Sequence, residues 1–170
     1  MAESLTLYKL IILFMLDRVN FPLRSSQISE FVLEREYMNY FQLQQAIAEL
    51  IDSNLIESKT IRNTSQFHLT SQGKETINYF GRNISPEIRK DIVHFLTENS
   101  YELRNEVSTV ADYRKIDTNE FTVRCYVKER DINLIDLSLT VPTKEAAEAI
   151  CSKWGAKNQE IYAYLMNELM

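Results

Sequence analysis

Residues 39–73 read NYFQLQQAIAELIDSNLIESKTIRNTSQFHLTSQG, and their apolar pattern changes from a helical one to an extended one. In the first part, apolar side chains recur at the spacing of one helix stripe: Leu43, Ile47, Leu50 and Ile51. Asn39 can cap this helix, and Asn54 can end it because asparagine tolerates the left-handed backbone conformation. The pattern therefore predicts a helix at residues 39–52.

Two short strands are expected after this helix. Residues 55–61 and 66–69 are rich in strand-forming residues and flank a polar tip at residues 62–65. Thr70 or Ser71 can then cap a further helix that extends to about residue 82. A helix, a β-hairpin and another helix thus follow one another with little connecting chain.

Two more helices are expected upstream of residue 39. The first covers residues 5–19 and is apolar on more than one face, so it should be buried on several sides. Pro22 ends this region, since proline disfavours helical geometry in the residue before it. The second helix starts at Ser25 or Ser26, either of which can act as its N-cap, and runs to about Arg35.

The order helix, helix, helix, strand, strand is typical of the winged helix-turn-helix, in which two helices brace a third that can enter the DNA major groove. Residues 43–56 resemble the third helix of that superfamily and the chain leading into its wing. Residues 69–73, LTSQG, resemble the step that closes the wing. Nearly the whole chain also resembles a bacterial family defined as a domain of unknown function, chiefly through residues 21–23 and 26–31. This resemblance implies a winged helix with an α/β tail and a role in transcriptional regulation, but no known ligand or operator.

The second half of the chain predicts a different arrangement. A Ser-Pro start favours a helix at residues 85–105. Apolar and polar residues then alternate at residues 121–128 and 135–141, as in antiparallel strands with one buried face, and residues 109–115 are a weaker strand candidate. Thr143 can cap a long last helix. We expect a helix, a three-stranded antiparallel sheet and a covering helix.

The fold class is therefore α+β, with two domains in a chain of 170 residues. We expect the winged helix-turn-helix at residues 1–82 and the α/β domain at residues 83–170. The net charge of −5 excludes a protein coated in basic surface. Residues 1–82 hold eight basic and nine acidic side chains, for a net charge of −1, and residues 83–170 hold eleven and fifteen, for −4. The first domain can thus carry a local basic edge, although its composition does not display one.

Helical periodicity selects the residues that would touch DNA. Asparagine and glutamine amides can make bidentate contacts to adenine, tyrosine can reach phosphate, and lysine and arginine can neutralise phosphate charge. The candidates are Asn39, Tyr40, Gln42, Gln45, Lys59, Arg62 and Arg24. The third helix has no Lys or Arg, so the commonest specific contact, arginine to guanine, is absent from it. The alternative for Gln42 and Gln45 is an ordinary solvated helix face.

Other kinds of site have little support in the sequence. Cys125 and Cys151 are isolated and are expected as buried free thiols, and His68 and His94 lack metal-ligand spacing. The motifs of phosphate loops, nucleophile elbows and zinc proteases are absent. The apolar run at residues 10–16 is too short to cross a bilayer, and the first thirty residues do not resemble a signal peptide. We expect a cytoplasmic protein that is not an enzyme and needs no metal or cofactor.

The expected function is that of a dimeric transcriptional regulator that binds double-stranded DNA. The helix at residues 39–52 would lie in the major groove, the wing at residues 57–69 would contact the backbone, and the tail would dimerise or sense a signal. The first helix, the helix from Pro86 and the last helix are the expected homodimer surfaces. The alternative is a winged-helix protein–protein adaptor without DNA binding, because an acidic third helix suits a basic partner.

The polar face of the C-terminal sheet leaves a further alternative open. Three residues of one strand could lie across from three of the next, depending on register: Arg124, Tyr126 and Lys128 across from Asp136, Ser138 and Thr140. This face is either a solvated surface with cross-strand pairs or a surface for a small molecule or partner.

Overall fold

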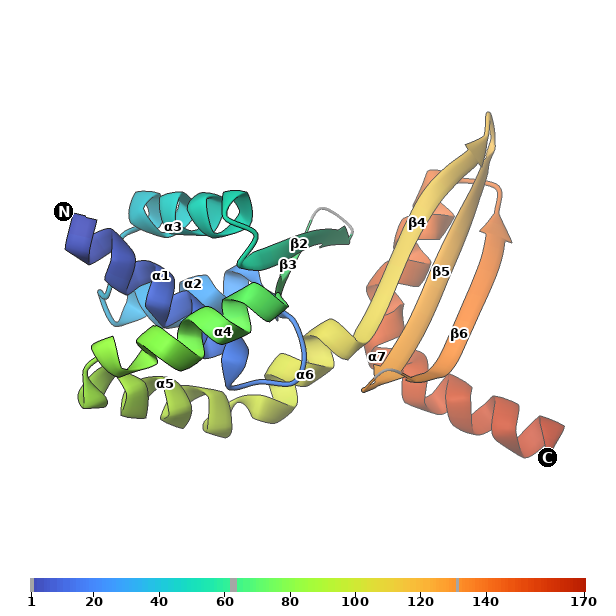
Figure 1. The fold of residues 1–170 in the computed structure, drawn as a ribbon. Helices are drawn as coiled ribbons and strands as arrows, with labels where there is room; N and C mark the ends of the chain where they lie inside the picture. Colours follow the sequence, from blue (N-terminus) through green and yellow to red (C-terminus); the bar gives the residue numbers. More distant parts are fainter. Residues whose placement is uncertain (1, 62–63, 131) are drawn as a thin grey trace. The chain divides into compact units, whose positions relative to one another are not determined.

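Helices and antiparallel strands make the protein α+β in the computed structural model, which describes residues 2–61, 64–130 and 132–170 (Figure 1). The chain forms two compact units, one ending at Val107 and the other beginning at Ser108. Each unit has an apolar core of its own.

The first unit is a helical bundle with one small sheet. Its elements are α1 (Ala2–Asp17), β1 (Leu23–Arg24), α2 (Ser25–Glu34), α3 (Tyr40–Asp52), β2 (Ile56–Ile61), β3 (Thr64–Leu69), α4 (Ser71–Phe80), the 3-10 turn η1 (Gly81–Asn83), α5 (Pro86–Glu98) and α6 (Ser100–Ser108). The helices predicted before and after the hairpin are thus confirmed, with shifts of a few residues at their ends. The hairpin follows α3 after three residues, as the sequence predicts.

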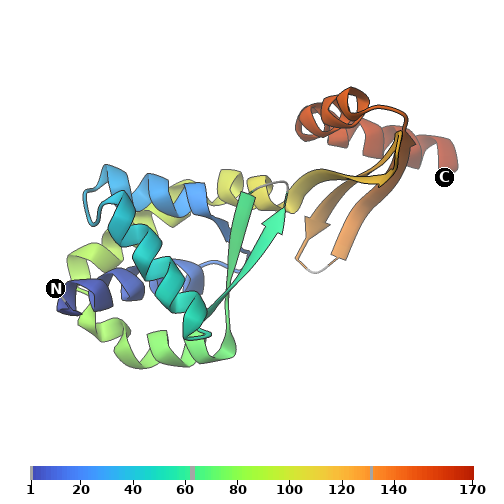
Figure 2. The same ribbon diagram turned by 90° about the horizontal axis from the view of Figure 1, so that it is seen from above.

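α1 is the centre of this unit. It packs against α3, α4 and α5, and all of residues 10–16 are buried. This burial confirms that α1 is covered on several sides, as its apolar pattern predicts. α3 lies over α1 and is the uppermost helix of the unit in Figure 1, and the view from above in Figure 2 shows it uncovered by the other helices of the unit.

The small sheet has the strand order β1-β3-β2 and is antiparallel throughout. β1 was not expected from the sequence, because two residues are too few for any alternation to be visible. Leu23 pairs with Phe67, and both side chains join the core. Arg24 pairs with Gln66, so these two side chains lie on the opposite face of the sheet.

The helix expected at residues 85–105 is two helices, α5 and α6. Asn99 ends α5, where its side-chain Nδ2 and its backbone N–H both donate to the Phe95 carbonyl. Ile92 of α5 and Leu103 of α6 are buried in the core of the first unit. The division between the units after Val107 therefore differs from the expected boundary after residue 82, because the apolar faces of α5 and α6 pack on the N-terminal helices.

The second unit is a three-stranded sheet covered on one face by a helix. β4 (Thr109–Asp117), β5 (Glu120–Glu129) and β6 (Ile132–Val141) form an antiparallel sheet in that order, and α7 (Lys144–Leu169) packs against it. Thr143 caps α7 by accepting the Ala146 N–H at 3.1 Å, as predicted. Trp154 of α7 is buried in this core, and its indole N–H donates to the Tyr126 carbonyl at 3.2 Å.

Candidate nucleic-acid interface

The start of α3 is fixed by a reciprocal pair of hydrogen bonds. Asn39 Oδ1 accepts from the Gln42 N–H at 2.9 Å, and Gln42 Oε1 accepts from the Asn39 N–H at 2.9 Å. This capping box satisfies two N–H groups that a helix end leaves unpaired. Both side chains already use an amide oxygen that a bidentate contact to adenine would need. Of the candidate DNA-contacting residues, Asn39 and Gln42 therefore serve chiefly to hold the helix.

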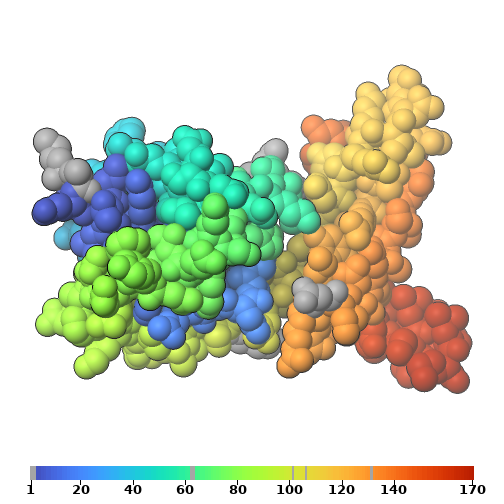
Figure 3. Space-filling model, in the orientation of Figure 1, coloured from blue at the N-terminus to red at the C-terminus, as the bar shows by residue number. Residues whose placement is uncertain are grey.

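The side of α3 that faces away from the core begins with two aromatic residues. Phe41 is 81% exposed and Tyr40 is 56% exposed, and their rings meet edge to face at 5.9 Å between centroids. The other exposed residues of this face are Gln44, Gln45, Ala48, Ile51 and Asp52. α3 and the following hairpin contribute to the surface of the first unit seen in Figure 3, in cyan and teal.

Tyr40 and Gln45 are thus placed on the surface as predicted, whereas sequence reasoning missed Phe41 and Gln44. The signal was present in the sequence. Both residues lie opposite the apolar stripe of the helix, at the positions that a period of 3.6 assigns to solvent. A large apolar residue such as Phe41 is readily assigned to the core by its type, and only its position along the helix corrects this.

The exposed face of α3 has almost no charge in its first half. Glu49 lies at the side of α3 and pairs with Lys9 of α1 at 3.8 Å. Asp52 is exposed at the last position of the helix. The surface that begins at Tyr40 therefore presents rings and amides, with carboxylates only toward its end.

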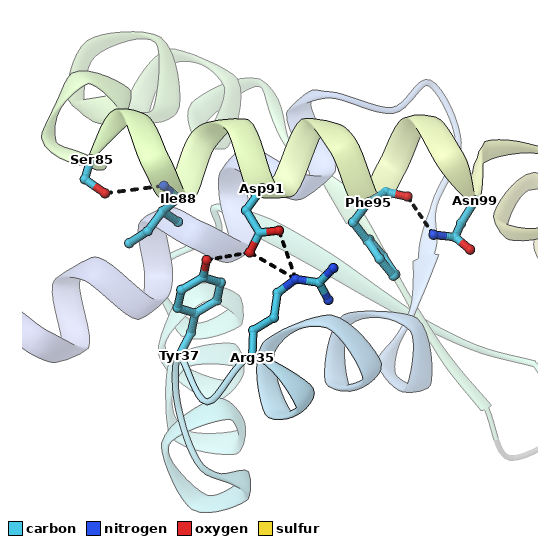
Figure 4. Close-up of polar contacts among 7 residues, drawn as sticks. All are labelled: Arg35, Tyr37, Ser85, Ile88, Asp91, Phe95 and Asn99. Atoms are coloured by element: carbon cyan, nitrogen blue, oxygen red, sulfur yellow. Dashed lines mark hydrogen bonds and ion pairs between the residues drawn. The ribbon is translucent and has the colours of Figure 1, made fainter.

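The turn between α2 and α3 is fixed to α5 by a half-buried ion pair. Asp91 of α5 accepts from the Tyr37 hydroxyl at 2.6 Å and from Arg35 Nε at 3.0 Å (Figure 4). The Arg35 guanidinium also stacks over the rings of Phe31, at 4.5 Å, and Phe95, at 5.4 Å. We name the group of Arg35, Tyr37 and Asp91 the turn clamp.

The turn clamp changes the pKa of Tyr37. Burial, the hydrogen bond to Asp91 and the charge of that carboxylate together raise the pKa of Tyr37 to about 12. The phenol is therefore a neutral donor at ordinary pH. The turn clamp holds the chain that leads into α3, so the direction of α3 is set from outside the helix as well as by its own cap.

The hairpin is attached to the end of α3 through Thr70. Its Oγ1 donates to the carbonyls of Asn54, at 2.7 Å, and Leu55, at 3.0 Å, and accepts from the Gly73 N–H at 3.0 Å. Asn54 ends α3 in the left-handed conformation with φ 57°, as predicted. The residues LTSQG that close the hairpin thus tie its second strand back to the end of α3.

Two of the predicted cationic residues lie on one face of the small sheet. Gln66 of β3 pairs with Lys59 of β2 on one side and with Arg24 of β1 on the other. Residues paired in this way share a sheet face, so Gln66 lies between the two cations. Lys59 is exposed, whereas Arg24 is half-buried and its Nε atom lacks a hydrogen-bond partner among the described residues. Arg62 falls outside the described residues.

The polar face of the C-terminal sheet is a network of cross-strand pairs. Tyr126 pairs with Asp136, and Arg124 pairs with Ser138. Arg124 makes two bonds to the Asp136 carboxylate, at 3.0 and 2.8 Å, and stacks over the Tyr126 ring at 4.8 Å. The hydrogen bonds from Arg124 hold the pKa of Asp136 below its ordinary value. These groups satisfy one another as cross-strand pairs, while Tyr126 itself is buried.

The cysteines and His94 lie in the core or in a surface pair. Cys125 and Cys151 are buried thiols outside a disulfide, as predicted, and burial raises the pKa of the Cys125 thiol to about 11. His94 pairs with Glu98 at 3.2 Å on the surface of α5. In the described part of the chain, no three His, Cys, Asp or Glu side chains are grouped so that they could hold a metal ion. Nor is any described helix both long and apolar enough to cross a membrane.

Comparisons with known proteins give one match. Neither the curated proteins nor the solved structures contain a protein that matches this chain. The family described as Domain of unknown function (DUF4364) matches residues 8–169, which span both units and agree with the resemblance seen in the sequence. The protein therefore belongs to the DUF4364 family.

Proposed function

We propose that the first unit is a winged helix-turn-helix and that the protein is a non-enzymatic transcriptional regulator that binds double-stranded DNA. In this proposal α2 and α3 form the helix-turn-helix, and the β2–β3 hairpin is the wing. α3 lies in the major groove, with the residues of its first turns toward the bases. The wing and β1 contact the phosphate backbone.

The observation that carries this proposal is the exposed face of α3. A helix of 13 residues spans about 20 Å, and the major groove is wide enough to admit it. Its cap, the turn clamp and Thr70 fix this helix at both ends, while its outer face presents Tyr40, Phe41 and Gln45 to solvent. A rigid helix with an uncommitted hydrogen-bonding face is what base readout requires.

Lys59 and Arg24 supply the second support. They lie on one face of the sheet that follows α3 directly. Contacts to phosphates position a protein on the duplex without reading its sequence, and cations next to a reading helix serve this purpose. Among the described residues these two cations are few, so the proposed complex depends on contacts to the bases and on pairing of two copies.

We further propose that the protein is a homodimer and that α7 provides the main contact. Of the three expected dimer surfaces, α1 uses the apolar residues 10–16 in its own core, and α5 uses Ile92 and Phe95 in the same way. The last turns of α7 keep large apolar side chains exposed: Tyr162, Tyr164, Met166 and Leu169. Two copies joined there would bring two reading helices to paired half-sites.

The test of DNA binding is a salt titration with the full chain and fluorescent genomic fragments. We expect the affinity to fall as salt rises, and we expect the Lys59→Ala variant to bind more weakly and to lower the slope of log K against log salt by about 1. Lys90→Ala is the matched control, because Lys90 is an exposed lysine on α5, a helix that lies on the other side of α1 from α3 in Figure 1.

The adaptor alternative gives a different result in the same experiment. A winged-helix adaptor would bind none of the fragments at the lowest salt concentration, while remaining folded and dimeric. That outcome would overturn the proposed regulator. Equal slopes for the parent chain and for both lysine variants would show that the wing does not contact phosphate.

A further inference from the structure

Building on the proposed function, we infer that the protein prefers A·T-rich DNA, with Phe41 packed against thymine methyl groups and Gln44 and Gln45 hydrogen-bonded to adenine. This inference names the class of base sequence that α3 reads. It concerns two residues, Phe41 and Gln44, that are not among the contacts expected from the sequence.

The Phe41 ring is exposed to solvent and is available to contact a partner. At 81% exposure it is the most exposed aromatic side chain in the described part of the chain. The neighbouring Tyr40 ring meets it edge to face, with an interplanar angle of 78°. Such a pair restricts the orientation of the ring and so reduces the entropy lost when it binds. Phe41 also lies in the first turn of α3, the part of a reading helix that contacts base edges.

The chemistry of the face matches one kind of base pair. In the major groove adenine offers an acceptor at N7 and a donor at N6, which a glutamine amide satisfies with two hydrogen bonds. Thymine offers a C5-methyl group, against which an apolar side chain packs. Phe41, Gln44, Gln45 and Ala48 thus provide a partner for each edge of an A·T pair.

The same face lacks the side chains that read G·C pairs. Guanine is read by arginine or lysine, and α3 contains neither. Cytosine is read by a carboxylate, but Glu49 is paired with Lys9. Asp52 lies about 16 Å further along the helix from Phe41. The first turns of α3 therefore favour A·T pairs, because they present glutamine and phenylalanine side chains and lack arginine and lysine.

The spacing of these residues fits neighbouring base pairs. Side chains three and four positions apart on a helix have Cβ atoms about 5–6 Å apart. Successive bases on a strand are about 3.4 Å apart along the duplex axis. Phe41 and the two glutamines therefore meet base pairs one or two steps apart, so the contacts predict a core of consecutive A·T pairs.

The experiment removes the thymine methyl group and the phenylalanine separately and together. Duplexes are selected from a random-sequence library with the full chain, and each thymine of a selected duplex is replaced in turn by deoxyuridine, which lacks only that methyl. We expect A·T-rich selected sites and about fourfold weaker binding when the contacted thymine is replaced, the loss that one buried methyl group implies. The Phe41→Ala variant should bind thymine and deoxyuridine duplexes equally, while its Tm stays that of the parent.

Tyr79→Ala is the matched control, because Tyr79 is also an exposed aromatic residue that meets its neighbour Phe80 edge to face. This variant should keep the full thymine preference. G·C-rich selected sites, or a deoxyuridine effect of equal size in the Phe41→Ala variant, would overturn the inference and leave DNA binding intact. Failure of the chain to select any duplex would overturn the proposed function and the inference together.

Discussion

At the scale of single residues, Gly73 is a position where the backbone closely approaches another part of the chain. A Cβ atom placed there would collide with the Leu55 carbonyl and lie 2.8 Å from Leu69 Cδ1. The same carbonyl accepts from the backbone N–H of Thr70 at 3.1 Å and from its hydroxyl at 3.0 Å. Any side chain at residue 73 thus pushes against the bonds that attach the hairpin to α3.

The Gly73→Ala variant is therefore expected to lower the free energy of unfolding by about 2–3 kcal/mol, the cost of overpacking a close contact. Gly155→Ala is the control, since a Cβ atom at Gly155 would meet nothing within 4 Å in the middle of α7. That change should raise stability by about 0.5–1 kcal/mol, because alanine favours helix more than glycine. Urea denaturation of both variants measures these changes. Equal effects of the two substitutions would contradict the close contact at Gly73.

At the scale of elements, most of the first unit could be predicted from local patterns. The caps at Asn39 and Ser85 accept the hydrogen bonds expected of them, as does Thr143 in the second unit. β1 could not be predicted, since its pairing with β3 joins residues more than forty positions apart. Glu36 takes a left-handed φ of 56° at the end of α2, a position where sequence reasoning looks for glycine or asparagine.

The candidate site was predictable to a smaller degree than the elements. Periodicity placed Tyr40 and Gln45 on the surface, but it could not show that Asn39 and Gln42 bind each other. Nor could it find the turn clamp, because Asp91 comes from a helix distant in sequence, and a half-buried carboxylate there looks like any surface acid. The roles of such residues depend on tertiary contacts, and a local sequence pattern does not show those contacts.

The turn clamp predicts a pH dependence that the Tyr37→Phe variant should remove. The pKa of Tyr37 is about 12 in the folded chain and 10.0 in its ordinary state. The unfolded chain therefore loses this proton first as pH rises, so the stabilisation is complete below pH 10 and is lost between pH 10 and 12. The free energy of unfolding of the parent should exceed that of the variant by about 1 kcal/mol at pH 7, and this difference should shrink above pH 10.

Urea denaturation at pH 7, 9 and 10.5 measures this difference. Tyr79→Phe provides the control, since Tyr79 is exposed on α4 and its substitution should leave stability at pH 7 unchanged. A gap between parent and Tyr37→Phe that stays constant from pH 7 to pH 10.5 would show that folding does not raise the pKa of Tyr37.

At the scale of the whole molecule, the two units differ in how fully they use their apolar residues. The first unit encloses the whole apolar run of α1, residues 10–16, whereas the second covers only one face of its sheet and leaves large apolar side chains exposed at the end of α7. Leu169 is 79% exposed. Such apolar surface is typical of a contact between chains.

Replacing Met166 and Leu169 together by lysine is expected to convert the proposed dimer into a monomer. Both side chains are exposed, and lysine is favourable near the C-terminal end of a helix, so the Tm of the second unit should change little. Sedimentation equilibrium measures the assembly state. Asn167→Lys adds one positive charge to the same turn, on the side of α7 away from Met166 and Leu169, and should weaken the dimer less than the double replacement. A parent chain that sediments as a monomer would refute the dimer.

The absence of cations from α3 has a consequence for how the proposed regulator would search a genome. Residence on arbitrary DNA depends on phosphate neutralisation, which also allows a protein to slide along the duplex. With few cations beside its reading helix, the protein would leave non-target DNA quickly and sample distant sites by repeated encounters from solution. Little of it would be sequestered on the chromosome, so the free concentration of dimer, and hence the level of expression, would set the occupancy of its target.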